Sequence, residues 1–186
     1  MKIKMKLFGT LVLILCCCIL VGTTLASGTA ETENLKAVFS WSEDNSSWSN
    51  AKENAASVFN SDAWEPGYTE MRYFNVKNNG EYDFTYQLQA VPEGQFSTLA
   101  EVIDVFYLIA PEKTYADRDE FLTTAVYAGT LSELTNGIIA EGALQKGANE
   151  TVAVALRMQE NAGNVYKGVA LGEFSLVFIA GTDELP

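Results

Sequence analysis

Carboxylates are the side chains in this chain that could do chemistry. The sequence contains no histidine, and its three cysteines, Cys16 to Cys18, are consecutive within an apolar run near the N-terminus. Beyond that run, the absence of both residue types excludes the usual zinc ligands, the Ser–His and Cys–His nucleophile pairs and the commonest general base. The chemistry that remains is carboxylate chemistry, either a glycosidase pair or a calcium site.

The densest acidic cluster contains Asp117, Asp119 and Glu120. It lacks the regularly spaced Asp, Asn and Gly residues of a calcium-binding loop, and Arg118 lies inside it. We therefore interpret it as a solvated connection between strands. No pair among the 24 acidic residues stands out as a glycosidase pair, so we assign no catalytic residue, no metal ligand and no cofactor.

Aromatic residues in the first half of the chain could instead bind sugars. They are Trp41, Trp48, Trp64, Tyr68 and Tyr73. Trp41 belongs to an apolar face, and Trp64 precedes a turn, where aromatic side chains often pack over the end of a β-sandwich. Core packing is the interpretation that we prefer for this set.

The N-terminus has the three parts of a secretory signal peptide. Lys2, Lys4 and Lys6 precede an uncharged apolar run from Leu7 to Gly22, and the small residues Thr24 and Ala26 follow. The run is shorter than the ~20 apolar residues that a membrane-spanning helix needs, so we expect no stable membrane span after cleavage. We predict a signal peptide over residues 1–26 with cleavage between Ala26 and Ser27, and cleavage after Ala30 is an alternative.

Removal of this segment makes the rest of the chain strongly acidic. Three of the 12 basic residues lie in residues 1–26 and all 24 acidic residues lie beyond them, which leaves nine basic residues and a net charge of −15. Such a charge disfavours nucleic acid and anionic membrane surfaces as partners. The remaining part, about 160 residues without cysteine, is long enough for one hydrophobic core.

The sequence after the predicted signal peptide has the pattern of β-strands separated by turns. We expect residues 27–34 to be a flexible lead-in, residues 35–41 to form a strand and Pro66-Gly67 to form a type II turn. Alternating runs over 71–77 and 82–90, on either side of Asn78-Asn79-Gly80, predict a hairpin.

The second half continues the same pattern. It contains a buried strand at 102–110, a short helix within 117–122, a helical turn at 130–134, a second hairpin formed by 138–144 and 150–158, and a last strand within 169–180. Seven to nine strands with turn signals between them predict an all-β fold, an antiparallel β-sandwich over residues 35–186 with short helices in its connections.

Two sequence blocks and the signal peptide together resemble one family. The first block runs from Trp64, Pro66, Gly67 and Tyr68 into an alternating strand and then Asn78-Asn79-Gly80; the second contains Ala162, Gly163, Asn164, Tyr166 and Gly168 before the terminal strand. In this order they are similar to the TasA and camelysin family, secreted proteins of Gram-positive bacteria whose signal peptides are processed by signal peptidases of the SipW type.

The resemblance implies a jelly-roll β-sandwich that is exported and assembles into fibres of the biofilm matrix or cell surface. In such fibres the N-terminal segment of one subunit adds as a strand to the sheet of the next. Residues 27–34 contain no aromatic side chain to fill a pocket, so the candidate donor strand is the following one, with Leu35, Ala37, Phe39 and Trp41. The implied partners are a second copy or a related matrix protein, and the signal peptidase.

Three functions follow as hypotheses. The first is a structural fibre subunit without catalysis. The alternative is a secreted metalloendopeptidase of the camelysin type, the enzyme class with which the family is catalogued, although a chain without histidine cannot build a familiar zinc-protease motif. The third is a surface binding module that uses the tryptophan-rich first half.

Overall fold

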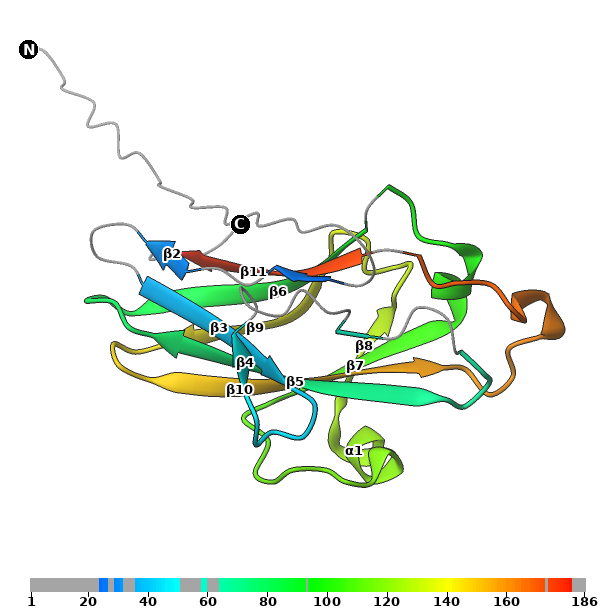
Figure 1. Ribbon diagram of the computed structural model, residues 1–186, viewed down its shortest axis with the longest axis horizontal. Helices are drawn as coiled ribbons and strands as arrows, with labels where there is room; N and C mark the ends of the chain where they lie inside the picture. Colours follow the sequence, from blue (N-terminus) through cyan, green and yellow to red (C-terminus); the bar gives the residue numbers. More distant parts are fainter. Residues whose placement is uncertain are drawn as a thin grey trace, which may run out of the picture.

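Two β-sheets pack face to face in the computed structural model (Figure 1), which describes residues 24–26, 29–31, 36–50, 58–59, 64–92, 94–172 and 174–181. Most of the predicted signal peptide and Leu35 therefore lie outside the described residues. Within residues 27–34, expected to be flexible, Thr29–Glu31 form a short strand. In the part that is described, no helix is long and apolar enough to cross a membrane.

One sheet has four strands. Their order across the sheet is β1 (Thr24–Ala26), β11 (Phe174–Gly181), β6 (Phe84–Pro92) and β9 (Ile138–Leu144). The β1–β11 pair is parallel, whereas the other two pairs are antiparallel. In the described part of the chain, β1 and β9 are therefore the outermost strands of this sheet.

The other sheet has seven strands and is antiparallel throughout. Its order is β2 (Thr29–Glu31), β3 (Lys36–Ser42), β5 (Thr69–Asn78), β10 (Asn149–Met158), β7 (Ile103–Ile109) and β8 (Val126–Thr130), with β4 (Ser49–Asn50) also paired to β3. Three short helices, η1 (Thr98–Val102), α1 (Arg118–Thr124) and η2 (Asn164–Tyr166), lie in the connections. The predicted all-β sandwich is confirmed, and the jelly-roll connectivity stays a prediction.

The core between the sheets consists of the inward faces that the alternation predicts. Val152, Val154 and Leu156 of β10 are buried there, in the same cluster as Phe174, Leu176 and Phe178 of β11. Phe178 of β11 stacks on Phe39 of β3, with ring centroids 4.5 Å apart, and so joins the two sheets near their edges. The predicted buried strand at 102–110 is β7, which is only partly buried along most of its length.

Both predicted hairpins are wrong. The strands β5 and β6 are consecutive but lie in different sheets, and the same holds for β9 and β10. Each connection is a corner that crosses from one sheet to the other. The alternation of apolar and polar residues indicates which side chains share a face of a strand. It does not indicate which strand is the neighbour in the sheet, so a hairpin and a corner have the same local pattern.

Asn78 holds the two corners together. Its buried amide nitrogen donates hydrogen bonds to the carbonyl oxygens of Tyr82 (2.8 Å) and Leu144 (3.2 Å), and its side-chain oxygen accepts one from the backbone N–H of Gly80 (3.0 Å). Its backbone also bonds to Gly147 and Ala148 of the β9–β10 corner. One asparagine thus satisfies polar groups that the two corners would otherwise bury unpaired.

A second, smaller apolar cluster lies on the outward face of the seven-stranded sheet. It contains Met71, Tyr73, Tyr115, Phe121, Ala153 and Ala155. The β7–β8 connection, which carries α1, covers this cluster from below in Figure 1. The helix predicted within 117–122 is confirmed, and its role is to close this outward cluster.

Candidate functional site

The outer edge of β11 is the feature that bears most directly on the predicted assembly. Phe174, Leu176 and Phe178 of this strand point into the core, as the alternation predicts. On one side, β11 pairs with β6 along its whole length, from Phe174 opposite Pro92 to Gly181 opposite Thr85. These contacts hold the strand in place and leave its other side for a further strand.

That further strand is β1, which comes from the predicted signal peptide. Thr24, Leu25 and Ala26 pair in parallel with Ser175, Leu176 and Val177. The predicted cleavage bond, between Ala26 and Ser27, directly follows the last paired residue. The sequence contained no signal for this pairing, because three residues are too few to show an alternation.

The next N-terminal segment, β2, covers the corresponding edge of the other sheet. Thr29, Ala30 and Glu31 pair antiparallel with Val38, Ala37 and Lys36 of β3. Cleavage at the alternative position, after Ala30, would therefore cut through β2. Figure 1 shows β2 next to β3, at the edge of the seven-stranded sheet. This edge is on the same side of the molecule as β11.

The candidate donor strand is already an integral part of the sandwich. Ala37, Phe39 and Trp41 of β3 are buried in the main core, and β3 pairs with β5 from Ala37 opposite Asn78 to Ser42 opposite Tyr73. Trp41 is 8% exposed. Transfer of β3 to a neighbour would expose these side chains unless a second copy supplied the same strand in exchange.

The structure brings the two family-like blocks together at one end of the sandwich. Trp64, Pro66, Ala162, Gly163 and Asn164 line a hollow of about 250 Å³. Gly67 has a φ of +81°, and the backbone N–H of Tyr68 bonds to the carbonyl of Glu65, which confirms the predicted type II turn.

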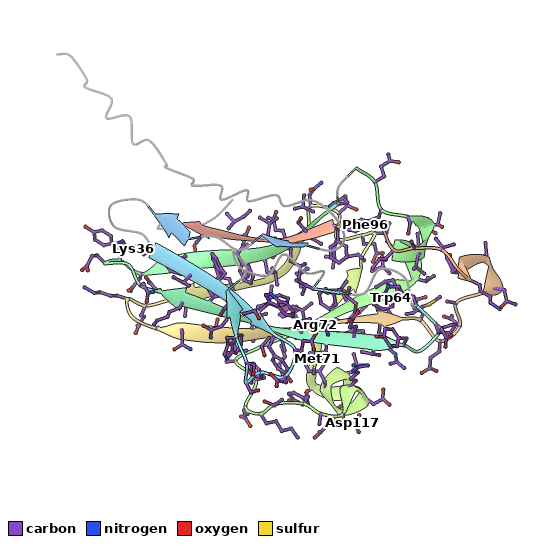
Figure 2. The ribbon with its side chains drawn as sticks, viewed as in Figure 1. Lys36, Trp64, Met71, Arg72, Phe96 and Asp117 are labelled. Carbon is purple, nitrogen blue, oxygen red and sulfur yellow. The ribbon has the colours of Figure 1, made fainter. Side chains whose placement is uncertain are left out.

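The remaining motif residues have structural positions. Tyr166 packs against the core, Gly168 has a φ of +74°, and Asn78 and Gly80 lie at the other end of β5. Lys36, whose carbonyl bonds to the backbone of Asn79, and Trp64 mark these two ends in Figure 2.

The tryptophans are mostly core residues. Trp41 and Trp64 belong to the main cluster, and Trp64 meets the ring of Tyr68 edge to face at 5.4 Å. Trp48 is the exposed member, at 38%. The interpretation of these aromatic residues as packing residues is confirmed for Trp41, Trp64 and Tyr73.

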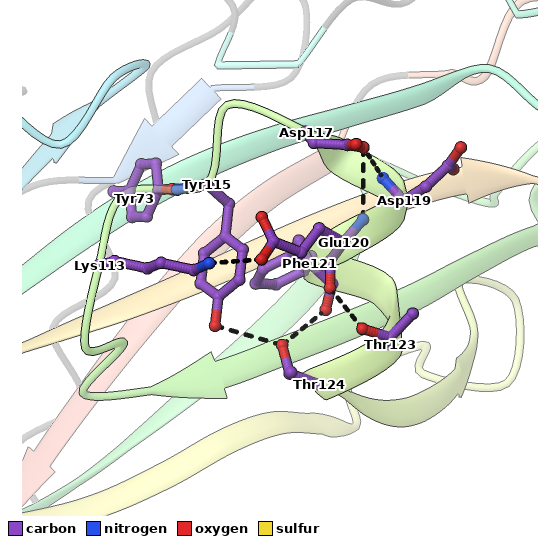
Figure 3. A network of polar contacts seen from close by, with 9 residues as sticks. All are labelled: Tyr73, Lys113, Tyr115, Asp117, Asp119, Glu120, Phe121, Thr123 and Thr124. Atoms are coloured by element: carbon purple, nitrogen blue, oxygen red, sulfur yellow. Dashed lines mark hydrogen bonds and ion pairs between the residues drawn. The ribbon is translucent and has the colours of Figure 1, made fainter.

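The acidic cluster at 117–120 has a structural role, shown in Figure 3. The Asp117 side chain caps α1 by accepting hydrogen bonds from the backbone N–H groups of Asp119 (2.9 Å) and Glu120 (3.3 Å). Glu120 forms an ion pair with Lys113. Where the β7–β8 connection meets the sheet, the hydroxyl of buried Tyr73 accepts a hydrogen bond from the backbone N–H of Tyr115 at 2.8 Å.

Two pairs of charged or polar side chains lie in or near the interior, Glu70 with Arg72 and Tyr86 with Glu150. Glu70 and Arg72 of β5 lie on the inward face and form an ion pair at 2.6 Å, with the Arg72 guanidinium 5.7 Å from the ring of Phe59. Tyr86 of β6 donates a hydrogen bond of 2.5 Å to Glu150 of β10, which links the two sheets. Burial, with that carboxylate, raises the pKa of Tyr86 above its ordinary value.

The exposed carboxylate of Asp44 has a lowered pKa. Asp44 accepts hydrogen bonds from the Ser46 hydroxyl, the backbone N–H groups of Ser47 and Ser46, and the Ser42 hydroxyl, which together hold its pKa well below the usual range. Within the described residues, His, Cys, Asp and Glu form no group of three or more that could hold a metal ion.

Comparison of the chain with protein-family models, with curated proteins and with solved structures finds no match. The TasA and camelysin resemblance therefore stays a prediction that rests on the sequence blocks.

Proposed function

We propose that the chain is a secreted structural subunit of extracellular or cell-surface fibres, such as those of a biofilm matrix, and that it assembles by strand addition. The observation that carries the proposal is the pairing of β1 with β11. The edge of a sheet is a row of backbone donors and acceptors that pairs readily with another chain. Once residues 1–26 are removed, β11 becomes such an edge among the described strands.

The donor in this proposal is the N-terminal segment of a neighbouring subunit. Of this segment, the structure describes Thr29–Glu31, which pair with β3 as the outermost strand of the seven-stranded sheet in the described part of the chain. If the candidate donor strand, with Leu35, Ala37, Phe39 and Trp41, moves as well, each subunit receives an equivalent strand from its neighbour, so that the buried contacts of β3 are kept. The proposed partner is a second copy of the chain or a related matrix protein.

The proposal includes the jelly-roll connectivity and export by a signal peptidase of the SipW type. Support for the first comes from the two corners, which send consecutive strands to opposite sheets. Support for the second comes from the order of lysines, apolar run and small residues at the N-terminus. No catalytic group is part of this proposal.

Negative-stain electron microscopy of the secreted protein tests the proposed function. We expect fibres, and more of them at acidic pH, where protonation of carboxylates reduces the net charge of −15 and with it the repulsion between subunits. Particles that stay monomeric at every pH, as judged by sedimentation, would contradict the proposal.

A pair of matched variants tests the edge itself. Ile179 lies in β11, and Ile138 lies in β9 at the opposite edge of the same sheet. We expect Ile179→Glu to reduce fibre formation at least tenfold, because charged side chains discourage strand addition at an edge. Ile138→Glu adds the same charge and should leave assembly unchanged. Equal effects of the two substitutions would exclude β11 as the assembly edge.

A further inference from the structure

The residues that occupy the β11 edge belong to the part of the chain that cleavage removes. β1 comprises Thr24–Ala26, and β2 begins at Thr29, beyond the predicted cleavage bond. Before cleavage, the four-stranded sheet therefore has β1 as its outer strand. After cleavage, β11 is the outermost strand on that side of the sheet among the residues that the structure describes.

The short length of β1 makes its pairing depend on chain connectivity. Its three residues cover Ser175, Leu176 and Val177 of an eight-residue strand. In the uncleaved chain, β1 is joined covalently to the rest of the domain through β2. Its effective concentration at the β11 edge is therefore on the order of millimolar. Once the bond after Ala26 is cut, this advantage is lost, and three residues alone bind too weakly to stay paired.

We propose that Thr24–Ala26 act as an internal cap on the β11 edge, which blocks strand addition until cleavage after Ala26 opens it to the N-terminal segment of a second copy. This inference rests on the proposed function and adds its regulation. The cap would prevent assembly before the bond after Ala26 is cut. Cleavage therefore has two effects on the subunit that is cut: it frees the N-terminal donor segment and it exposes the acceptor edge at β11.

The geometry of the cap also predicts the kind of assembly. A strand from a second copy that takes the place of β1 joins two different surfaces, the N-terminal segment of one subunit and the β11 edge of the next. Such a head-to-tail interface does not close on itself and extends as an open filament. A longer donor can also pair beyond Val177, along Phe178–Gly181, and this extra pairing favours the donor over the cap.

The first experiment detects the cap by disulfide cross-linking in the full chain. Ser27→Pro is introduced to block cleavage, which mass spectrometry verifies, and the native thiols are removed by Cys16→Ser, Cys17→Ser and Cys18→Ser. Ala26→Cys with Val177→Cys then places two thiols at paired positions. Neighbouring strands lie about 4.8 Å apart, within the Cα separation that a disulfide spans.

The matched control replaces Val177→Cys with Ala143→Cys. Ala143 lies in β9, at the far side of the same sheet and beyond both β11 and β6. We expect an intramolecular disulfide in the Val177 variant and none in the Ala143 variant after oxidation. No cross-link in either variant, or equal cross-linking in both, would show that β1 does not occupy the β11 edge.

The second experiment measures the effect of the cap on assembly. Two secreted forms are compared, one beginning at Ser27 and one beginning at Thr24, which retains β1. Sedimentation should show that the Thr24 form assembles at least tenfold more slowly than the Ser27 form. The Thr24 form with Leu25→Pro, which removes a backbone donor from β1, should assemble as fast as the Ser27 form.

The outcomes separate the two proposals. If the Ser27 form does not assemble, the proposed function fails, and there is no assembly for the cap to regulate. If all three forms assemble at the same rate, the fibre function stands and the internal cap is refuted. Slower assembly of both Thr24 forms would also refute it, because the delay would then come from the added residues and not from strand pairing.

Discussion

Gly142 of β9 is the position at which the addition of one methyl group should disturb the sandwich most directly. A Cβ atom at this residue would lie 2.6 Å from the Oη atom of Tyr86 and 2.7 Å from its Cε1 and Cζ atoms. Tyr86 cannot easily move away. It is fully buried, its hydroxyl bonds to Glu150, and its ring lies 6.2 Å from that of Phe178. We therefore predict that Gly142→Ala destabilises the fold.

The expected loss follows from two opposing effects. Overpacking of a filled site costs about 1–3 kcal/mol. Replacement of glycine by alanine restricts the unfolded chain, which returns about 0.4–1 kcal/mol. The net destabilisation should be about 1–2 kcal/mol, which corresponds to a decrease in Tm of about 2–8 °C for a domain of this size.

Urea unfolding of residues 27–186, followed by tryptophan fluorescence, measures the effect. Gly163→Ala is the matched control, because Gly163 has a φ of −74° and no atom within 4 Å of an added Cβ. Its effect should be below about 0.5 kcal/mol. The clash itself is tested in a Tyr86→Leu background, where Gly142→Ala should cost little.

The same substitution in a Tyr86→Phe background should remain costly, because phenylalanine keeps the Cε1 and Cζ atoms that the new methyl group meets. Equal stability of the wild-type chain and Gly142→Ala would refute the reasoning. So would an undiminished cost in the Tyr86→Leu background, because the loss would then have another cause than the contact with Tyr86.

Three further predictions concern the polar groups of the fold. Tyr73→Phe should destabilise the protein by about 1–3 kcal/mol in urea unfolding, because the buried N–H of Tyr115 loses its acceptor; an unchanged midpoint would contradict this role. Asp117→Ala should cost about 1 kcal/mol through the loss of the cap of α1 and should speed hydrogen exchange at Asp119 and Glu120, whereas Asp119→Ala should leave these amides protected. The carboxyl of Asp44 should titrate below the ordinary range in NMR. Because its pKa is lowered on folding, its stabilising contribution is present above the unfolded pKa and is lost as the pH falls through the folded pKa; an ordinary titration would show that these hydrogen bonds do not persist in solution.

Several local features of the fold could be predicted from sequence because their causes are local. Gly67 accepts the positive φ that follows Pro66 in a type II turn, and the alternation of Phe174, Leu176 and Phe178 identifies the inward face of a strand. The short helix at α1 also has a local cause, since Asp117 caps it. Each of these signals lies within a few residues of the structure that it predicts.

The partners of the strands could not be predicted in the same way. Asn78-Asn79-Gly80 is typical of a hairpin turn, yet Asn78 bonds to Leu144 and Ala148, which are distant in sequence, and the chain crosses to the other sheet there. The Tyr86–Glu150 link and the clash at Gly142 likewise depend on residues brought together by folding. No local sequence pattern predicts these contacts, because each one joins residues that are distant in the sequence.

The sequence by itself determines the chemistry and the local conformation of this protein: a chain without histidine, acidic beyond its N-terminal segment, with alternating strands and defined turns. These properties follow from residue types and short spacings. Only the tertiary structure decides that Thr24–Ala26 pair with Ser175–Val177, some 150 residues away. That pairing is made by backbone groups, which every residue carries, so it cannot be predicted from the side chains of a three-residue segment.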